Sequence, residues 1–185
     1  PVNLPPLLEG IEKLMRPLAQ QKGLGFAMEL TNDLPSWVEV DGTRLRQIFL
    51  NLVTNAIKFS DAGTVAVKVG RDEKAAPDQA NTYPLRLDVV DEGIGMDHAT
   101  LTKLFERFAQ GDASTSRRFG GTGLGLEISR NLARRMGGDI KANSVLGKGS
   151  TFTVTLPLAL AAPPKLPVSL GQPHTPAASS AELAG

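Results

Sequence analysis

The sequence predicts a two-layer α/β sandwich of the α+β class, in which helices cover one face of a mostly antiparallel mixed sheet. Two observations predict it. Long segments with apolar residues at helical spacing occur among short segments in which apolar and polar residues alternate, and glycine, proline or small polar residues separate them. With 185 residues, of which 41% are hydrophobic, the chain is long enough to form one domain with a substantial core.

The first helix is expected over residues 6–22, where leucine, isoleucine and methionine recur at helical spacing. Pro17 should bend or weaken it, because proline lacks the N–H that a helix interior needs, and Gly23 should follow its end. Short strands are then expected at 26–30 and 37–40, on either side of the turn TNDLPS.

A second long helix is expected over residues 44–59, with Asp41 or Thr43 as its cap. The polar stretch Ser-Asp-Ala-Gly closes it. Its apolar face consists of Leu45, Ile48, Phe49, Leu52, Val53 and Ile57.

The second half of the chain alternates strands and helices. Strands at 64–70 and 84–91 should form a hairpin with a long polar connection, and 97–108 is helical in character. Residues 109–121 are polar, contain glycine and show no period, which predicts a mobile loop. A helix at 124–136 and strands at 139–144 and 150–158 complete the domain.

Composition excludes several classes of function. Twenty basic and nineteen acidic side chains give a net charge of +1 without a basic run, which does not favour nucleic acid as a partner. The absence of cysteine excludes disulfides, thiolate metal sites and cysteine nucleophiles. No apolar run approaches the roughly 18 residues of a membrane span. We therefore expect a soluble cytoplasmic domain, on the cytoplasmic side of the membrane if the parent protein is a membrane receptor.

The C-terminal stretch differs in composition from the rest of the chain. Residues 1–160 should form the folded domain, whereas 161–185 are rich in proline and alanine and lack aromatic residues. This predicts a flexible linker that joins a following domain, with a simple disordered tail as the alternative.

The stretch FGGTGLGLEISRNL, residues 119–132, places four glycines within six residues before a helix. The spacing Gly121-x-Gly123-x-Gly125 follows a polar loop instead of a strand, which disfavours a Rossmann turn, and the lysine of a P-loop is missing. What remains is a glycine loop that leads into a helix N-terminus, where free N–H groups favour a polyanion. A tight structural turn is an equally good interpretation of this stretch alone.

Three polar residues follow one another at helical spacing near the end of the second helix. Asn51, Asn55 and Lys58 share one face beside the apolar stripe. An asparagine oxygen suits Mg²⁺, which commonly keeps several waters and binds substrate phosphates, and Lys58 supplies a counter-charge. Amides at the edge of a core are the alternative.

A carboxylate ends a strand in the stretch DVVDEGIGM. After Asp91, Gly93 and Gly95 allow a sharp turn and a close approach of the backbone to a ligand. The carboxylate can accept a hydrogen bond from an exocyclic amine while Ile94 and Met96 pack on a ring, which suits adenine. A plain acidic turn is the alternative.

Four motifs in order resemble a known family. NLVTNAIKFS, DEGIGM, LFERFAQ and GGTGLGL are similar to the N, G1, F and G2 boxes of the ATP-binding catalytic domain of sensor histidine kinases, and the resemblance spans residues 1–158. It implies the Bergerat (GHKL) fold, shared with gyrase-type, heat-shock chaperone and mismatch-repair ATPases. The chain resembles the kinase branch of this fold in its KFS ending, its LFERF box and the absence of a transducer domain.

The resemblance assigns roles to individual residues. It implies that Asn55 binds Mg²⁺, that Asp91 bonds the adenine amine, that Lys58 contacts phosphate and that Phe59 lies near the base. The full set that it assigns to nucleotide binding is Asn51, Asn55, Lys58, Phe59, Asp91, Gly93, Ile94, Gly95, Met96, Phe108, Gly121, Thr122, Gly123, Leu124, Gly125, Leu126 and Thr151.

The resemblance also describes an ATP lid. Gly121, Gly123 and Gly125 would act as its hinges, and Arg117 and Arg118 are candidates for contact with the γ-phosphate, with solvated charge as the alternative. Phe105 and Phe108 resemble the F box, for which core packing that anchors the lid is the alternative role.

The position of Asn51 bears on mechanism. In the ATPase branches, the residue four before the Mg²⁺ asparagine is a glutamate that activates water, and an amide cannot usefully accept a proton. Direct hydrolysis of ATP should therefore be slow. The expected catalytic residues are Asn51, Lys58 and Arg117.

These inferences predict a kinase catalytic domain with ATP and Mg²⁺ as cofactors. The γ-phosphoryl group would pass to a histidine on a separate dimerisation and phosphoacceptor domain, within a homodimeric parent, because neither His98 nor His174 lies in a context like H-E-x-R-x-P. A receiver domain joined after residue 185 is a further expectation. A regulatory nucleotide-binding module, a pure interaction domain and a GHKL ATPase are the alternatives.

Overall fold

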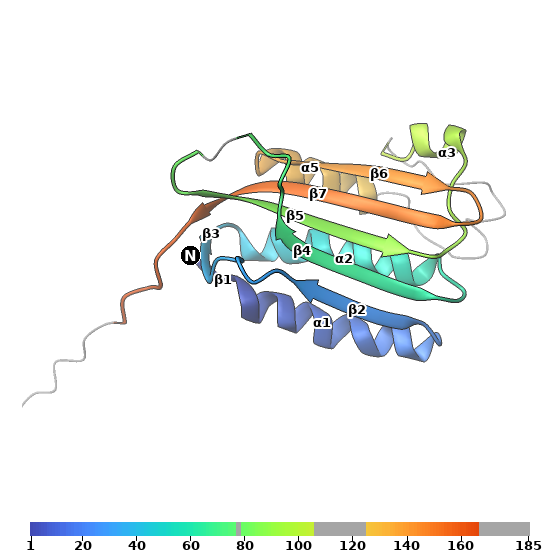
Figure 1. Cartoon of the computed structure of the whole chain (residues 1–185), viewed down its shortest axis with the longest axis horizontal. Helices are drawn as coiled ribbons and strands as arrows, with labels where there is room; N and C mark the ends of the chain where they lie inside the picture. The colour runs from blue at the N-terminus through green and yellow to red at the C-terminus, as the bar shows by residue number, and fades with distance from the viewer. Residues whose placement is uncertain (77–78, 106–124, 167–185) are drawn as a thin grey trace, which may run out of the picture.

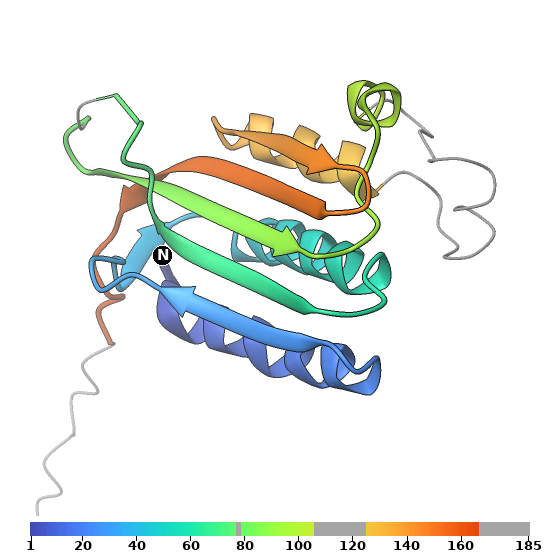
Figure 2. The same cartoon turned by 45° about the vertical axis from the view of Figure 1, so that its right-hand side comes forward.

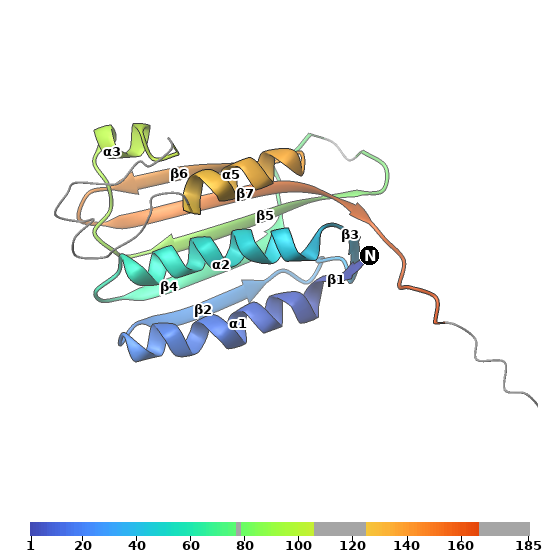
Figure 3. The ribbon, with the colours of Figure 1, turned by 180° about the vertical axis from the view of Figure 1, so that it is seen from behind.

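The computed structural model describes residues 1–76, 79–105 and 125–166, and in this part of the chain the longer helices lie on one face of a seven-stranded sheet (Figures 1 and 3). The predicted two-layer architecture is confirmed. The elements are β1 (Val2–Asn3), α1 (Leu4–Gln21), β2 (Gly25–Leu30), β3 (Trp37–Glu39), α2 (Gly42–Lys58), β4 (Thr64–Arg71), β5 (Thr82–Asp91), α3 (His98–Thr102), α5 (Gly125–Arg135), β6 (Asp139–Val145) and β7 (Gly149–Leu160).

The sheet is mixed and mostly antiparallel, as predicted. Its strand order is β1-β3-β7-β5-β4-β2, and β6 also pairs with β7. The hairpin of β4 and β5 forms as expected, whereas β2 pairs with β4 in parallel. The strands on either side of the TNDLPS turn are not neighbours, because β2 pairs with β4 and β3 pairs with β7 and β1.

The core lies between the sheet and the helices α1 and α2. All six residues of the predicted apolar face of α2 are buried, and so is every second residue of β5 from Tyr83 to Val89. Asp91 continues this alternation, so that the pleat of the strand places its side chain on the helix-covered face. The register of β5 thus buries a carboxylate at the end of a strand.

Helix α1 begins at Leu4, earlier than predicted. Pro5 and Pro6 occupy its first turn, where proline is tolerated because the N–H groups have no partner within the helix. The helix continues through Pro17, which is exposed, so this proline does not interrupt it. Gly23 follows the helix with a φ of +75°, a conformation that glycine adopts without a side-chain penalty.

Helix α2 is capped by Asp41, which settles the choice between Asp41 and Thr43. The Asp41 carboxylate accepts a hydrogen bond from the Arg44 backbone N–H at 3.1 Å. Of the helix predicted over 97–108, α3 covers the first part and ends at Thr102. Residues 103–105 form a turn, so the prediction is wrong there, and residues 106–108 lie outside the described ranges. The predicted mobile loop and most of the predicted tail, residues 167–185, also lie outside them. No helix within the described ranges is long and apolar enough to cross a membrane.

Candidate functional site

Five segments meet at one end of the sheet, the end away from the N-terminus (Figures 1 and 2). They are the C-terminal end of α2, the end of β5, the start of α5, the segment that leads to α3, and the turn between β6 and β7. The segments expected to bind adenine, metal and phosphate therefore lie close together.

Asp91 places a buried carboxylate at this end. It is 6% exposed, and its Oδ1 accepts a hydrogen bond from the Gly93 N–H at 2.9 Å. Burial raises the pKa of Asp91 above its usual value, and backbone hydrogen bonds from Gly93 and Ser150 oppose this effect. The side chain is thus a hydrogen-bond acceptor held in a fixed orientation at a largely desolvated position.

The turn after Asp91 is pressed against the end of α2. A Cβ on Gly93 would lie 2.4 Å from the Phe59 carbonyl oxygen and 2.8 Å from Asp91 Oδ1. The same carbonyl accepts a hydrogen bond from the Ile94 N–H at 3.3 Å. Only glycine fits at position 93, which explains the first glycine of the DEGIGM motif.

The other side of this turn packs against the turn between β6 and β7. Gly95 has a φ of +65°, and a Cβ there would lie 2.0 Å from the Val145 carbonyl oxygen. The Gly147 N–H donates to the Ile94 carbonyl at 2.7 Å, and the Met96 N–H donates to Ser144 Oγ in β6 at 2.8 Å. The turn that carries Ile94 and Met96 is therefore fixed on both sides.

The end of α2 contributes Asn55, Lys58 and Phe59. Asn55 and Lys58 are half-buried, and the Lys58 ammonium lies 5.7 Å from the centre of the Phe59 ring. Lys22 was not predicted, and its Nζ donates to the carbonyls of Ile57 at 2.9 Å and Lys58 at 2.7 Å. A cation at these last carbonyls stabilises the helix end that presents Asn55 and Lys58.

Asn51 points toward α5. Its Nδ2 donates to Ser129 Oγ at 2.7 Å, and a Cβ on Gly125 would lie 2.5 Å from Asn51 Oδ1. Gly125 therefore has a packing role in addition to the hinge role predicted for it. The contact joins the helix of the N box to the helix that follows the G2 box.

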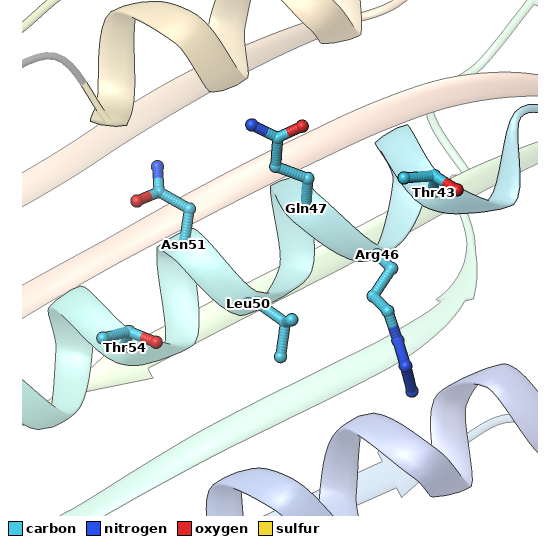
Figure 4. Close-up of a pocket in the computed structure, with 6 residues that line it drawn as sticks. All are labelled: Thr43, Arg46, Gln47, Leu50, Asn51 and Thr54. Atoms are coloured by element: carbon cyan, nitrogen blue, oxygen red, sulfur yellow. The ribbon is translucent and has the colours of Figure 1, made fainter.

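A shallow groove of about 520 Å³ runs along the outward face of α2 (Figure 4). Asn51 and Gln47 lie on its side toward α5, and the Arg46 side chain extends toward α1. Its lining residues are Thr43, Arg46, Gln47, Leu50, Asn51 and Thr54. Apart from Asn51, none of these lining residues belongs to the predicted nucleotide site, so this groove is a separate feature.

The comparisons with known proteins agree with this geometry. Residues 40–160 match the family model described as Histidine kinase-, DNA gyrase B-, and HSP90-like ATPase. The chain belongs to this family. Since the match covers the C-terminal strand as well as α2, β4 and β5, the prediction of an ATP-binding catalytic domain of the histidine kinase type is confirmed at the level of family and fold.

Sensor proteins and sensor histidine kinases are among the proteins similar to this chain. The chain is 45% identical over 157 residues to the aerobic respiration control sensor protein ArcB of Escherichia coli (strain K12), a match that covers 84% of this chain and 19% of that protein. It is 39% identical over 158 residues to the sensor histidine kinase GacS of Pseudomonas protegens, with coverages of 85% and 17%. The chain thus spans about a fifth of the length of these relatives.

Solved structures give the same result. Full-length ShkA in complex with AMPPNP superposes with a TM-score of 0.70 at 34% identity, over 88% of this chain and 32% of that one. The nucleotide-free catalytic domain of the histidine kinase ThkA superposes with a TM-score of 0.64 at 26% identity, over 84% and 94% of the two chains. Both superpositions thus extend over more than four fifths of this chain.

Within this family domain, the register distinguishes two neighbouring hydroxyls. Ser150 pairs with Asp91 and is buried on the helix-covered face, whereas Thr151 pairs with Val90 and lies on the opposite face of the sheet. Ser150 Oγ also lies 2.8 Å from Ser144 Oγ. Ser150, which the sequence analysis missed, is therefore the hydroxyl residue beside Asp91, and the nucleotide-binding role predicted for Thr151 stays a prediction.

Leu126, in the first turn of α5, is partly buried against the core. The remaining predicted site residues lie outside the described residues. These are Phe108, Arg117, Arg118, Gly121, Thr122, Gly123 and Leu124, and the predictions for them stay predictions. His98 is described and is exposed at the start of α3.

Proposed function

We propose that this domain binds ATP with Mg²⁺ and supplies the γ-phosphoryl group for autophosphorylation of a histidine on a separate dimerisation and phosphoacceptor domain, in two-component signal transduction. The observation that carries the proposal is the buried Asp91 carboxylate at the end of β5, held by the glycine turn that follows it. Membership of the ATPase family and similarity to ShkA, which was solved in complex with AMPPNP, support it.

Asp91 has the properties required to select adenine. The Gly93 N–H occupies Oδ1, which orients the carboxylate so that Oδ2 can accept from an exocyclic amine. Ile94 and Met96 are partly buried next to it and supply apolar surface for the ring. A buried acceptor discriminates strongly against a ligand that lacks the matching donor.

Asn55 is the protein ligand that we propose for Mg²⁺. Among the described residues, no group of three or more histidine, aspartate, glutamate or cysteine side chains could hold a metal ion. The neutral oxygen of a single asparagine fits an ion that keeps waters and binds mainly through the phosphates of its nucleotide. Mg²⁺ would neutralise charge on those phosphates, and Lys58, one turn after Asn55, would add a second positive charge.

The neutral side chain of Asn51 favours phosphoryl transfer over direct hydrolysis of ATP. Its amide donates to Ser129 and is neutral, so it cannot remove a proton from water. Phosphoryl transfer instead depends on positioning ATP toward an external nucleophile.

Replacing Asn51 by Glu is expected to raise basal ATP hydrolysis several-fold, because a carboxylate at this position can act as a general base. Phosphate release measured at saturating ATP checks this, with Gln47→Glu as a control one turn earlier on the same helix. Equal rates for the wild type and Asn51→Glu would contradict the role assigned to Asn51.

Transfer itself is tested with radiolabelled ATP and a dimeric acceptor hairpin supplied as a separate polypeptide. We expect acid-labile label on the hairpin, no label on this chain alone, and little release of phosphate. Steady phosphate release without labelled hairpin would favour a true ATPase. Nucleotide binding without transfer or hydrolysis would favour a regulatory module.

The arrangement of the parent protein is also a proposal. We infer that the domain acts in a homodimer on the cytoplasmic side of the membrane, with residues 161–185 as a linker to a receiver domain. The similarity to sensor kinases several times the length of this chain supports this arrangement.

A further inference from the structure

Arg130, in the middle of α5, connects three segments of the chain, one of which carries Phe105 of the predicted F box. Its guanidinium carbon lies 4.5 Å from the centre of the Phe105 ring, which is well within the range of a cation–π contact. Its Nε donates to Asp139 Oδ1 at 2.9 Å, and its Nη2 donates to Asp139 Oδ2 at 3.4 Å. One side chain therefore joins α5, the start of β6 and the chain after α3.

The fork on Asp139 fixes the plane of the guanidinium. Both side chains are about 30% exposed, at 27% for Arg130 and 31% for Asp139. The pKa of Asp139 is lowered to about 2, chiefly by the hydrogen bond from Arg130, so the carboxylate stays charged throughout the physiological range. Because two hydrogen bonds hold the planar guanidinium, it presents its face to the aromatic ring in a single orientation.

These contacts lie next to elements of the proposed nucleotide site. Phe105 is the last described residue before 106–124, and α5 begins immediately after that segment. Helix α5 is in turn joined to α2 by the hydrogen bond between Asn51 and Ser129. The contact with Arg130 therefore sets the position of Phe105 relative to the helix that carries Asn55.

We propose that Arg130 is a positioning residue for nucleotide binding, which acts by holding Phe105 in a fixed place against α5. The inference rests on the proposed function, because it assigns a further residue to the ATP site suggested there. Arg130 is not among the residues assigned to direct contact with ATP, and its effect passes through Phe105.

Titration calorimetry of ATP and Mg²⁺ into the full 185-residue chain tests the proposal. Arg130→Gln should weaken ATP binding about 3- to 10-fold, the range expected for losing one partly buried cation–π contact. Phe105→Leu should cause a similar loss, whereas Phe105→Tyr, which keeps the ring, should retain the wild-type affinity. The double variant Arg130→Gln with Phe105→Leu should lose no more than either single variant, because both remove the same contact.

Arg134 offers a matched control. It also donates to Asp139 Oδ1, at 3.1 Å, but it is 54% exposed, and no contact between it and Phe105 is seen among the described residues. Arg134→Gln should therefore leave ATP affinity unchanged.

The outcomes separate this inference from the proposed function. If the wild type binds ATP and Arg130→Gln binds it with the same affinity, the positioning role alone is overturned. Losses of affinity that add in the double variant would also overturn that role alone. A lower melting temperature without a change in affinity would assign Arg130 to stability and would also overturn it. A wild-type chain that does not bind ATP would contradict the proposed function, and this inference with it.

Discussion

Replacing Asp91 by Asn is expected to weaken ATP binding by about 100-fold, which corresponds to the loss of a hydrogen bond to a charged, buried acceptor. The Gly93 N–H holds Oδ1, so that in the variant the amide NH₂ occupies the position of Oδ2. Two donors, the side-chain amide of the variant and the adenine amine, would then face each other.

The same substitution is expected to stabilise the ligand-free protein at neutral pH. Burial raises the pKa of Asp91 above its usual 3.8, so the folded chain holds this proton more tightly than the unfolded chain. The charged side chain therefore begins to reduce stability as the pH rises past 3.8, and the full cost is present above the raised pKa. Asparagine carries no charge and does not incur this cost.

Thermal denaturation with and without ATP measures both effects in one experiment. Asp91→Asn should melt at a higher temperature than the wild type without ATP at pH 7, and the difference should shrink as the pH falls through the raised pKa. Millimolar ATP should raise the melting temperature of the wild type much more than that of the variant. Asp88→Asn is the matched control, because Asp88 lies on the same strand but on the outer face, paired with Arg86. An equal ATP-induced shift in Asp91→Asn and the wild type would contradict the adenine assignment.

Replacing Gly149 by Ala is expected to lower the free energy of unfolding by about 3 kcal/mol or more, the combined cost of backbone strain and overpacking. Gly149 has a φ of +117°, and a Cβ there would lie 2.0 Å from the Asp91 carbonyl oxygen. Neither β5 nor β7 can move away without breaking the register that places Asp91 opposite Ser150. The variant should therefore also lose affinity for ATP.

Gly147→Ala separates the cost of backbone strain from the cost of a steric clash. Gly147 has a φ of +78°, but no atom lies within 4 Å of the position that its Cβ would take. Only the conformational cost of about 1 kcal/mol should remain. Urea denaturation midpoints compare the two variants. Similar losses for Gly147→Ala and Gly149→Ala would show that the close approach to Asp91 is not the cause.

Much of the fold could be predicted because its signals are local. The spacing of Leu45, Ile48, Phe49, Leu52, Val53 and Ile57 fixes the buried face of α2, and the alternation along β5 fixes which residues point inward. Asp91 stood out for a similar reason, since it ends an alternating strand and two glycines follow.

The remaining features depend on contacts between distant segments. No local sequence pattern predicts the parallel pairing of β2 with β4, because β2 would bury the same side chains whichever strand it paired with. Lys22 is an ordinary lysine at the end of a helix until the fold brings it to the last carbonyls of α2. The choice between Ser150 and Thr151 requires the register of β7, which a shift of one residue would reverse.

The most direct test of the account is the location of ATP on the domain, measured from backbone amide NMR shifts as ATP and Mg²⁺ are added. We predict the largest changes from Asp91 to Met96 and at the end of α2 near Asn55, with smaller changes at Asn55 when Mg²⁺ is omitted. Changes concentrated in the groove lined by Thr43, Arg46 and Leu50, or no change at millimolar ATP, would contradict the proposed site.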